Sequence, residues 1–402
     1  MRTAAAALLA AFVLSGCGAD HENIADRAVS VASGPAEAAV IAPTPPPAPA
    51  PAKFQAEIER IAQPFAGDVG IAVKDLQSGW AASWQADRFF PQQSTMKIWL
   101  AVAVLDAVDR GELSLDEVVV VTPADLSLFN SPLVRPLTMK TGRLETTIEQ
   151  LLKWALSKSD NGATDLLMRR MGGPAEVQKV LDRKGLRGVR GGLEQRVLQP
   201  RISGLEWRPE YIDGDLFNRA RDQVSDAERD AALERYLRMP ADGATPVGTA
   251  NALEALYRGK LLSPASTQRL LTIMFESRAG AGRLRAGLPK AEVGSEPAAL
   301  WRLSHKTGTG PDWRRVTAGF NDVGVMVAPD GRAYAVAVYI GRTDRPVPER
   351  QKLIADVSRA VVAHWESGRP APQPVTVAEA PAPEPAPIVA TTGSAGAKTA
   401  TP

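Results

Sequence analysis

Residues 94–105 of this chain read STMKIWLAVAVL, a serine and a lysine followed by an unbroken apolar run. The run from Ile98 to Leu105 leaves no polar face, so we expect a helix that begins at Ser94 and is buried on all sides. The lysine at position 97 comes one helical turn after the serine, so both side chains fall on the same face. This stretch therefore predicts a central buried helix with a serine and a lysine next to each other at its start.

Strand patterns lie at both ends of the folded part of the chain. Two short strands are expected near residues 68–75 and 80–86, with a turn at Gln77-Ser78-Gly79. Strands at both ends, with helices between them, predict an α+β fold of two lobes: an antiparallel five-stranded sheet flanked by helices, and an all-helical lobe. The later strands are expected at residues 302–307, 317–328 and 332–340, with a hairpin turn at Asp330-Gly331.

Helices are predicted by apolar spacing and by start signals. Thr146 with Glu149, and Ser225 with Glu228, have the spacing of capping boxes before apolar residues. Other helices are expected around Phe54–Ala62, Thr164–Met171, Pro174–Gly185, from Ser263-Pro264, and over Pro348–Trp365.

The two ends of the chain do not have the composition of a folded domain. Residues 1–17 combine an early arginine with an apolar run too short to span a bilayer, which predicts a signal peptide. Leu14-Ser15-Gly16-Cys17 resembles the lipidation box of bacterial lipoproteins, which implies an acylated Cys17 and a periplasmic protein tethered to a membrane, the outer membrane in view of Gly18. Residues 18–52 and 369–402 are rich in Ala and Pro and predict a linker and a disordered tail. The folded catalytic domain is thus expected over residues 53–368.

Composition excludes several kinds of site. The formal net charge is only +2, which gives no strong field toward nucleic acid. One cysteine and three histidines provide no cluster for a zinc ion and no disulfide within a monomer. We expect no metal, no cofactor, no nucleic-acid partner, and a monomer that acts on a small molecule.

Three short motifs occur in a meaningful order. They are Ser94-x-x-Lys97, Ser159-Asp160-Asn161 and Lys306-Thr307-Gly308. S-x-x-K alone is weak, since a chain of this length contains about one by chance, and each of the other two has an ordinary reading as a helix end or a strand end. The ordered trio is much harder to obtain by accident, so it predicts an acyl-transfer site.

The residue types suit that chemistry. Ser94 is a nucleophile, and Lys97 accepts its proton if burial and the ammonium of Lys306 keep the Lys97 amine neutral. Ser159 is placed to relay a proton to a leaving nitrogen, and Asn161 to hydrogen-bond a substrate amide and Lys97. The remaining predicted substrate-binding residues are Lys306 and Thr307 for a carboxylate, Gly308 for close approach, and Thr309, whose N–H would join that of Ser94 in an oxyanion hole.

With these motifs in this order, the chain resembles the class A serine β-lactamases and the related penicillin-binding proteins. The resemblance extends over about residues 53–366. It implies hydrolysis of β-lactam antibiotics through an ester on Ser94, with Lys97 as base, Ser159 as proton relay and Lys306 as carboxylate site. The centre of Ser159-Asp160-Asn161 resembles class A more than the wider peptidase family.

The chain departs from the family where the base that releases the ester is expected. An insertion near residues 200–241 lengthens the loop that carries this glutamate in the family. Aligned without a gap from Arg190 to Leu198, that position falls on Gln195, and a one-residue bulge brings Glu194 there instead. We expect Glu194 to be the catalytic carboxylate, with Glu206 and Glu210 as alternatives. The arginine that anchors the substrate carboxylate is left open among Arg314, Arg315 and Arg342.

Two other functions stay open at this point. A D-alanyl-D-alanine peptidase would use the same acylation residues on a cell-wall peptide. A slowly deacylating or inactive tethered homologue would keep the fold without rapid turnover.

Overall fold

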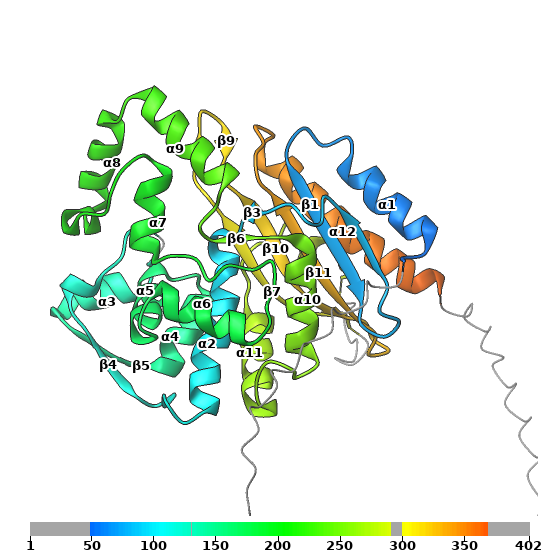
Figure 1. Cartoon of the computed structure of the whole chain (residues 1–402), viewed down its shortest axis with the longest axis horizontal. Helices are drawn as coiled ribbons and strands as arrows, with labels where there is room; N and C mark the ends of the chain where they lie inside the picture. The colour runs from blue at the N-terminus through cyan, green and yellow to red at the C-terminus, as the bar shows by residue number, and fades with distance from the viewer. Residues whose placement is uncertain (1–48, 130, 291–299, 369–402) are drawn as a thin grey trace, which may run out of the picture. The chain divides into compact units, whose positions relative to one another are not determined.

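The computed structural model describes residues 49–129, 131–290 and 300–368. The predicted signal peptide and tail, and nearly all of the predicted linker, lie outside these ranges. Five strands form one antiparallel sheet in the order β2-β1-β11-β10-β7, as expected (Figure 1). These strands are β1 (Val69–Asp75), β2 (Ala81–Trp84), β7 (Arg302–Thr309), β10 (Phe320–Val327) and β11 (Ala333–Ile340).

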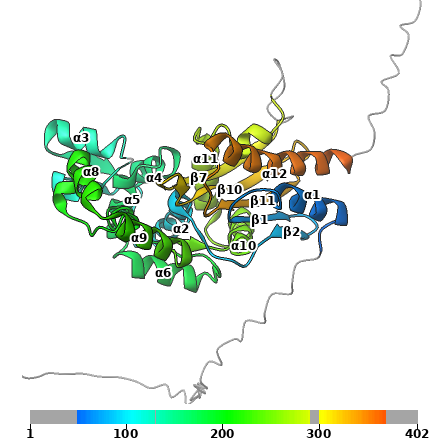
Figure 2. The same ribbon diagram turned by 90° about the horizontal axis from the view of Figure 1, so that it is seen from above.

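Each face of the sheet packs against helices. Val69, Ile71 and Val73 alternate onto one face, where they pack against α1 (Ala52–Ala62) and α12 (Val347–Ser367). Ala72 points to the other face, which packs against the buried helix α2 (Lys97–Asp109) and its neighbours. Figure 2 shows the helical lobe beside this sheet. The other long helices of this second core are α4 (Ile148–Ser157), α5 (Asn161–Arg170), α6 (Pro174–Arg183), α10 (Pro246–Tyr257) and α11 (Pro264–Glu276).

The central helix is buried as predicted, since every residue of α2 from Lys97 to Ala107 is buried. It begins three residues later than expected. Ser94 lies instead in a 3-10 turn, η1 (Gln93–Met96), that leads into α2. A tighter turn at a helix start is common, and here it places the serine at the surface of the core.

The predicted cap at Thr146 is wrong by one residue. Thr147 is the N-cap of α4, and its hydroxyl accepts a hydrogen bond from Gln150 N at 3.2 Å. Thr146 belongs to strand β5 (Leu144–Thr147), which pairs with β4 (Val118–Val121), and its buried hydroxyl has no hydrogen-bond partner among the described residues. The strand pairing takes precedence over the local capping pattern. The predicted capping box of Ser225 and Glu228 is confirmed at the start of α9 (Asp226–Arg238).

Helix α5 was predicted, but it begins at Asn161, before the expected Thr164, because Asp160 caps it by accepting from Ala163 N at 2.9 Å. Several other elements were not predicted because they are short or lack a clear apolar period: α3 (Val134–Thr141), α7 (Gln195–Ile202), α8 (Gly214–Gln223), α10, the two-residue strands β3 (Phe90–Pro91), β6 (Gly243–Ala244), β8 (Asp312–Trp313) and β9 (Val316–Thr317), and the 3-10 turns η2 (Pro123–Asp125), η3 (Pro209–Ile212) and η4 (Leu284–Gly287).

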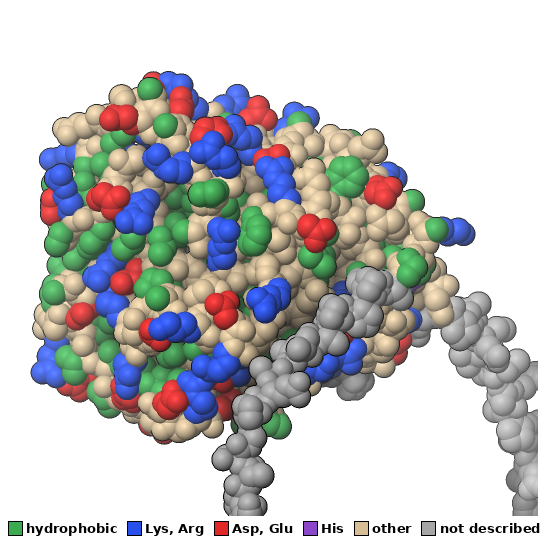
Figure 3. Space-filling view, viewed as in Figure 1, with side chains coloured by type: hydrophobic (Ala, Val, Ile, Leu, Met, Phe, Trp, Pro, Cys, Tyr) green, Lys and Arg blue, Asp and Glu red, His purple; other side chains and the backbone are tan. Residues whose placement is uncertain are grey.

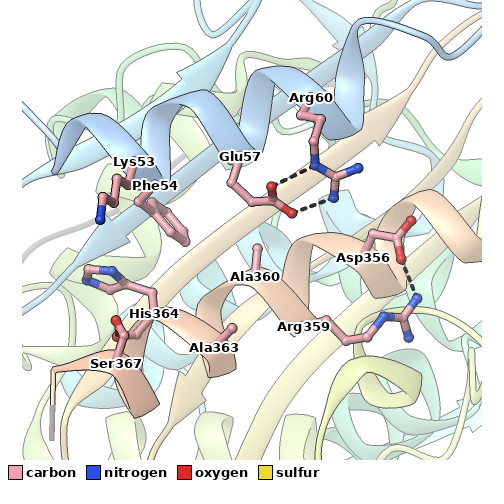
Figure 4. Close-up of a pocket in the computed structure, with 10 residues that line it drawn as sticks. All are labelled: Lys53, Phe54, Glu57, Arg60, Asp356, Arg359, Ala360, Ala363, His364 and Ser367. Carbon is pink, nitrogen blue, oxygen red and sulfur yellow. Dashed lines mark hydrogen bonds and ion pairs between the residues drawn. The ribbon is translucent and has the colours of Figure 1, made fainter.

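The surface carries both signs of charge. Figure 3 shows Lys and Arg side chains interspersed with Asp and Glu side chains over one face, in line with the small net charge. A pocket of about 430 Å³ lies between α1 and α12, beside the ion pair of Glu57 and Arg60 (Figure 4). It is on the sheet face opposite α2, away from the three motifs. Among the described helices, none has the length and apolar character needed to cross a membrane.

Candidate active site

The three motifs meet where the two lobes touch. Ser94 comes from η1, Ser159 from the junction between α4 and α5, and Lys306 from β7 at the edge of the sheet. The Ser159 hydroxyl lies 3.3 Å from Lys97 Nζ and 3.0 Å from Lys306 Nζ. Lys97 and Lys306, far apart in the chain, therefore converge on the Ser159 hydroxyl. Ser94 lies one helical turn before Lys97.

Lys97 is fully enclosed. Its Nζ donates to Asn161 Oδ1 at 2.7 Å and to the Ser159 carbonyl at 2.8 Å, and the residue is 1 % exposed. Burial lowers the pKa of Lys97 to about 7, although the charges of Asp160 and Asp165 oppose this shift. At neutral pH a large fraction of this amine is unprotonated, which is the form that accepts a proton.

Ser159 is held in a backbone conformation that non-glycine residues seldom adopt. Its φ is 56°. The next residue fixes this junction, since the Asp160 carboxylate accepts from Ser131 Oγ at 3.0 Å and from the backbone N–H of Leu133 and Val134 at 3.0 and 3.1 Å. The loop before α3 and the start of α5 are thereby tied together, with Ser159 aimed between the two lysines. Such local strain is common at functional sites.

Lys306 is as buried as Lys97. Its Nζ donates to the Thr307 carbonyl at 2.9 Å as well as to Ser159 Oγ. Burial lowers the pKa of Lys306 well below its usual range, and the neighbouring cations Lys97 and Arg283 lower it further. The charge of Lys97 thus favours the neutral form of Lys306 across Ser159, whereas burial is what lowers the pKa of Lys97.

Gly308 lets the strand edge meet the nucleophile turn. A Cβ at this position would lie 2.3 Å from the Gln92 carbonyl and 3.2 Å from Gln93 Cβ. Asn321 on β10 joins the same elements by donating to the Pro91 and Gln92 carbonyls at 2.7 and 3.0 Å. The protein's own backbone just before Ser94 thus occupies the space where a Cβ of residue 308 would lie, and the close approach of a substrate to Gly308 stays a prediction.

The arginine next to the strand edge is Arg283, which the sequence analysis missed. It lies at the start of η4, 6 % exposed, and donates to the Gly308 carbonyl at 2.9 Å and to Thr309 Oγ1. Burial lowers the pKa of Arg283 to about 10. Only the fold brings this loop to β7, and no local pattern marks the residue.

The three arginines that the sequence left open as carboxylate anchors do not lie at the β7 edge. Arg314 pairs with Asp226 and Asp230 on α9, and Arg342 pairs with Glu234 on the same helix. Arg315 is exposed, with a positive φ of 70°. The structure gives none of them a hydrogen bond to the β7 edge among the described residues.

Glu194 and Gln195 lie at the start of α7 but face different groups. The Glu194 carboxylate pairs with Arg169 Nη1 at 2.7 Å and Arg196 Nε at 2.9 Å. Gln195 is 1 % exposed, and its Nε2 lies 3.9 Å from the sulfur of Met96 in the nucleophile turn. The assignment of Glu194 as the release base stays a prediction, and the placement of its carboxylate argues against it.

The insertion packs against the β8–β9 hairpin, which follows β7 in the chain. It forms η3, α8 and α9, and Trp313 Nε1 on the β8–β9 hairpin donates to Asp230 of α9 at 2.7 Å. A small cavity of about 70 Å³ lies between them, lined in part by Phe129, Gln199 and Trp313. Glu206 and Glu210, the alternative carboxylates, are both exposed and lie beside Arg201 and Arg208.

No group of three or more His, Cys, Asp or Glu side chains is arranged to hold a metal ion within the described ranges.

Comparisons with known proteins agree with this geometry. A family model described as the beta-lactamase enzyme family matches residues 53–365. The chain is 26 % identical to beta-lactamase VEB-1 of Pseudomonas aeruginosa over 306 residues, which cover 75 % of this chain and 87 % of that protein. It is 28 % identical to the extended-spectrum beta-lactamase PER-1 of the same organism over 272 residues, covering 67 % of this chain and 73 % of that protein.

Solved structures give the same result. A beta-lactamase from Chitinophaga pinensis superposes with a TM-score of 0.60 at 27 % identity, covering 79 % of this chain and 100 % of that one. A class A beta-lactamase described as the last common ancestor of Gram-negative bacteria superposes with a TM-score of 0.59 at 30 % identity, covering 78 % of this chain and 100 % of that one.

Proposed function

Because the chain belongs to the beta-lactamase enzyme family, as a class A serine enzyme that opens the β-lactam ring through an acyl-enzyme, we propose that Ser94, Lys97 and Ser159 carry out acylation. The observation that carries this proposal is the Ser159 hydroxyl between two buried amines, 3.3 Å from Lys97 Nζ and 3.0 Å from Lys306 Nζ. A hydroxyl in that position passes protons without a histidine.

The groups act in sequence. Neutral Lys97 accepts the proton of Ser94 Oγ as that oxygen bonds to the β-lactam carbonyl carbon. The backbone N–H groups of Ser94 and Thr309 stabilise the oxyanion. As the carbon–nitrogen bond of the ring breaks, Ser159 gives its hydroxyl proton to the leaving nitrogen and takes up the proton that Lys97 accepted from Ser94, so that Lys97 is neutral again. Asn161 orients Lys97, to which it is hydrogen-bonded at 2.7 Å, and also binds the substrate amide.

The substrate carboxylate binds at the edge of β7. Lys306, Thr307 and Thr309 lie along this edge, and Arg283 reaches Thr309 Oγ1 from η4. Gly308 keeps that edge against the nucleophile turn. A carboxylate there gains charge-assisted hydrogen bonds, which are stronger than neutral ones.

The test is ring opening of nitrocefin by the purified full-length protein, followed by its colour change. We expect one molecule to be opened per protein at least, and none by Ser94→Ala. Release of D-alanine from a D-alanyl-D-alanine peptide is measured in parallel. Rapid peptide cleavage without ring opening would favour a peptidase and contradict the proposal.

We also propose that Cys17 is lipidated and tethers a monomeric enzyme on the periplasmic side of a bacterial membrane, the outer membrane in particular. Its support is the sequence alone: an apolar run followed by Leu14-Ser15-Gly16-Cys17. Labelling of cells with a radioactive fatty acid should mark the protein, and Cys17→Ala should abolish the label. An unlabelled protein recovered from the periplasmic fluid would contradict the tether.

A further inference from the structure

A cluster of three amide side chains lies against the turn that carries the nucleophile. Gln195 Oε1 accepts from Gln199 Nε2 at 3.2 Å, and Gln199 Nε2 also lies 3.3 Å from Gln93 Oε1, on the residue directly before Ser94. Gln195 Nε2 reaches the Met96 sulfur on the other side of the same turn. Gln195 is therefore a buried α7 side chain that contacts the nucleophile turn directly through Met96 and, through Gln199, the residue before Ser94.

The carboxylates near this cluster already accept hydrogen bonds or form ion pairs with other protein groups. Asp165, Asp242 and Glu194 contact the turn η1 or the start of α7, and Asp160 directly follows Ser159 in the chain; each of these four carboxylates is bound by at least two donors of the described structure. The donors are Ser131 Oγ and three backbone N–H groups for Asp160, Ser127 Oγ and the N–H groups of Gln195 and Arg196 for Asp165, Gln93 N and Tyr236 OH for Asp242, and Arg169 and Arg196 for Glu194.

The backbone of α7 keeps Gln195 in its place. Asp165 accepts hydrogen bonds from Gln195 N and, at 3.0 Å, from Arg196 N, so the start of the helix is anchored to α5. A one-residue shift that exchanged Glu194 for Gln195 would break these bonds and the Glu194 ion pairs. It would also leave a buried carboxylate at Asp165 without two of its donors, which is costly.

From this arrangement we propose that Gln195 stands where a release base would act, so that the protein opens β-lactams readily but holds the product as a long-lived ester on Ser94. This inference rests on the proposed function and concerns its second half. Release requires water to add to the ester carbonyl carbon while its proton passes to an acceptor. An amide oxygen accepts a hydrogen bond from that water but does not take the proton.

The slow route that remains uses an amine. Neutral Lys97 takes the proton of the attacking water, the bond between Ser94 Oγ and the acyl carbon breaks, and Lys97 returns the proton to Ser94 Oγ. The products are the ring-opened acid and the free serine, so atoms and charge balance. The Lys97 amine already donates to Asn161 Oδ1 and to the Ser159 carbonyl and serves the acylation step, so we expect it to act slowly as the base for release.

Intact-mass measurement of the full-length protein mixed with nitrocefin tests the proposal, together with the colour change. The wild type should show a burst of about one equivalent and an adduct that persists for many minutes. Gln195→Glu should acylate with the same burst and release the product at least tenfold faster, since positioned general bases contribute about 10²–10⁴-fold. Gln268→Glu, which adds the same charge on the exposed face of α11, should behave as the wild type.

Three results would overturn the proposal. One is steady wild-type turnover in which no adduct accumulates. Another is Gln195→Glu that acylates fully but releases no faster. The third is loss of release on Glu194→Gln, which would return the role to that carboxylate. The lifetime of the wild-type adduct decides the matter even if a charge at position 195 prevents folding. Absence of any adduct with no ring opening would instead reject the acylation site itself.

Discussion

The protonation state of Lys97 sets the pH at which Ser94 becomes a nucleophile. The amine is buried, next to Lys306 across Ser159, and the carboxylates of Asp160 and Asp165 act on it from α5. Burial lowers the Lys97 pKa to about 7. Because only the unprotonated amine accepts the serine proton, the acylation rate should increase with pH through about 7 and level off above it.

Stopped-flow acylation by nitrocefin across this pH range measures the effect. Lys97→Ala should lower the rate constant by about 10²–10⁴ and remove the inflection. A wild-type rate that is flat from about pH 6 to 8, within the range where general bases are tuned, would contradict a Lys97 base.

Arg283 should act on the carboxylate of the substrate. Arg283→Ala removes a buried cation that reaches Thr309 Oγ1, and we expect KM for a carboxylate-bearing β-lactam to increase roughly tenfold or more, the size of a lost charged hydrogen bond. The matched comparison is the same β-lactam with this carboxylate esterified, together with Arg283→Lys, which retains the charge. An equal loss on acid and ester would show that Arg283 only supports the strand.

At the scale of elements, the start of α4 shows whether the cap expected from the sequence, Thr146, or the cap seen in the structure, Thr147, stabilises the helix. Thr147→Ala removes the hydroxyl that accepts from Gln150 N, and it should cost about 1 kcal/mol of unfolding free energy. Thr146→Val removes a buried hydroxyl that has no described partner, so it should cost nothing or stabilise the protein. Thermal unfolding distinguishes them, with a Tm decrease of roughly 2–4 °C expected for Thr147→Ala alone. The reverse order of effects would support a cap at Thr146.

Long periodic elements were predictable from the sequence. The apolar positions Phe54, Ile58 and Ile61 of α1 are all buried, and the five strands fall where alternation and turn residues place them. Such elements are determined by their own apolar pattern. The insertion was predictable only in part: the capping box of Ser225 and Glu228 marks the start of α9, but α8 buries only Phe217, and contacts such as that of Trp313 with Asp230 hold the segment.

The same contrast holds within the site. Ser94, Lys97, Ser159 and Lys306 belong to short motifs that can be found in the sequence. Arg283 reaches the site only because η4 packs beside β7, and the difference between Glu194 and Gln195 depends on which of two adjacent side chains turns inward. Both depend on tertiary contacts that local sequence does not encode.

At the scale of the whole molecule, two lobes each supply part of one acylation site. The sheet contributes Lys306 at its β7 edge, and the helical lobe contributes Ser159 between α4 and α5. Separate cores stabilise the two sides of the sheet, one with α1 and α12 and the other around α2. The nucleophile turn lies at their junction and contacts both lobes.

A crystal structure of the full-length protein after reaction with a β-lactam tests this convergence most directly. We predict an ester on Ser94 Oγ, with Ser159 Oγ toward the former ring nitrogen and the substrate carboxylate within about 3.2 Å of a donor on Lys306, Thr307, Thr309 or Arg283. An adduct on another residue, or an ester on Ser94 with Ser159 and Lys306 turned away from it, would contradict the account.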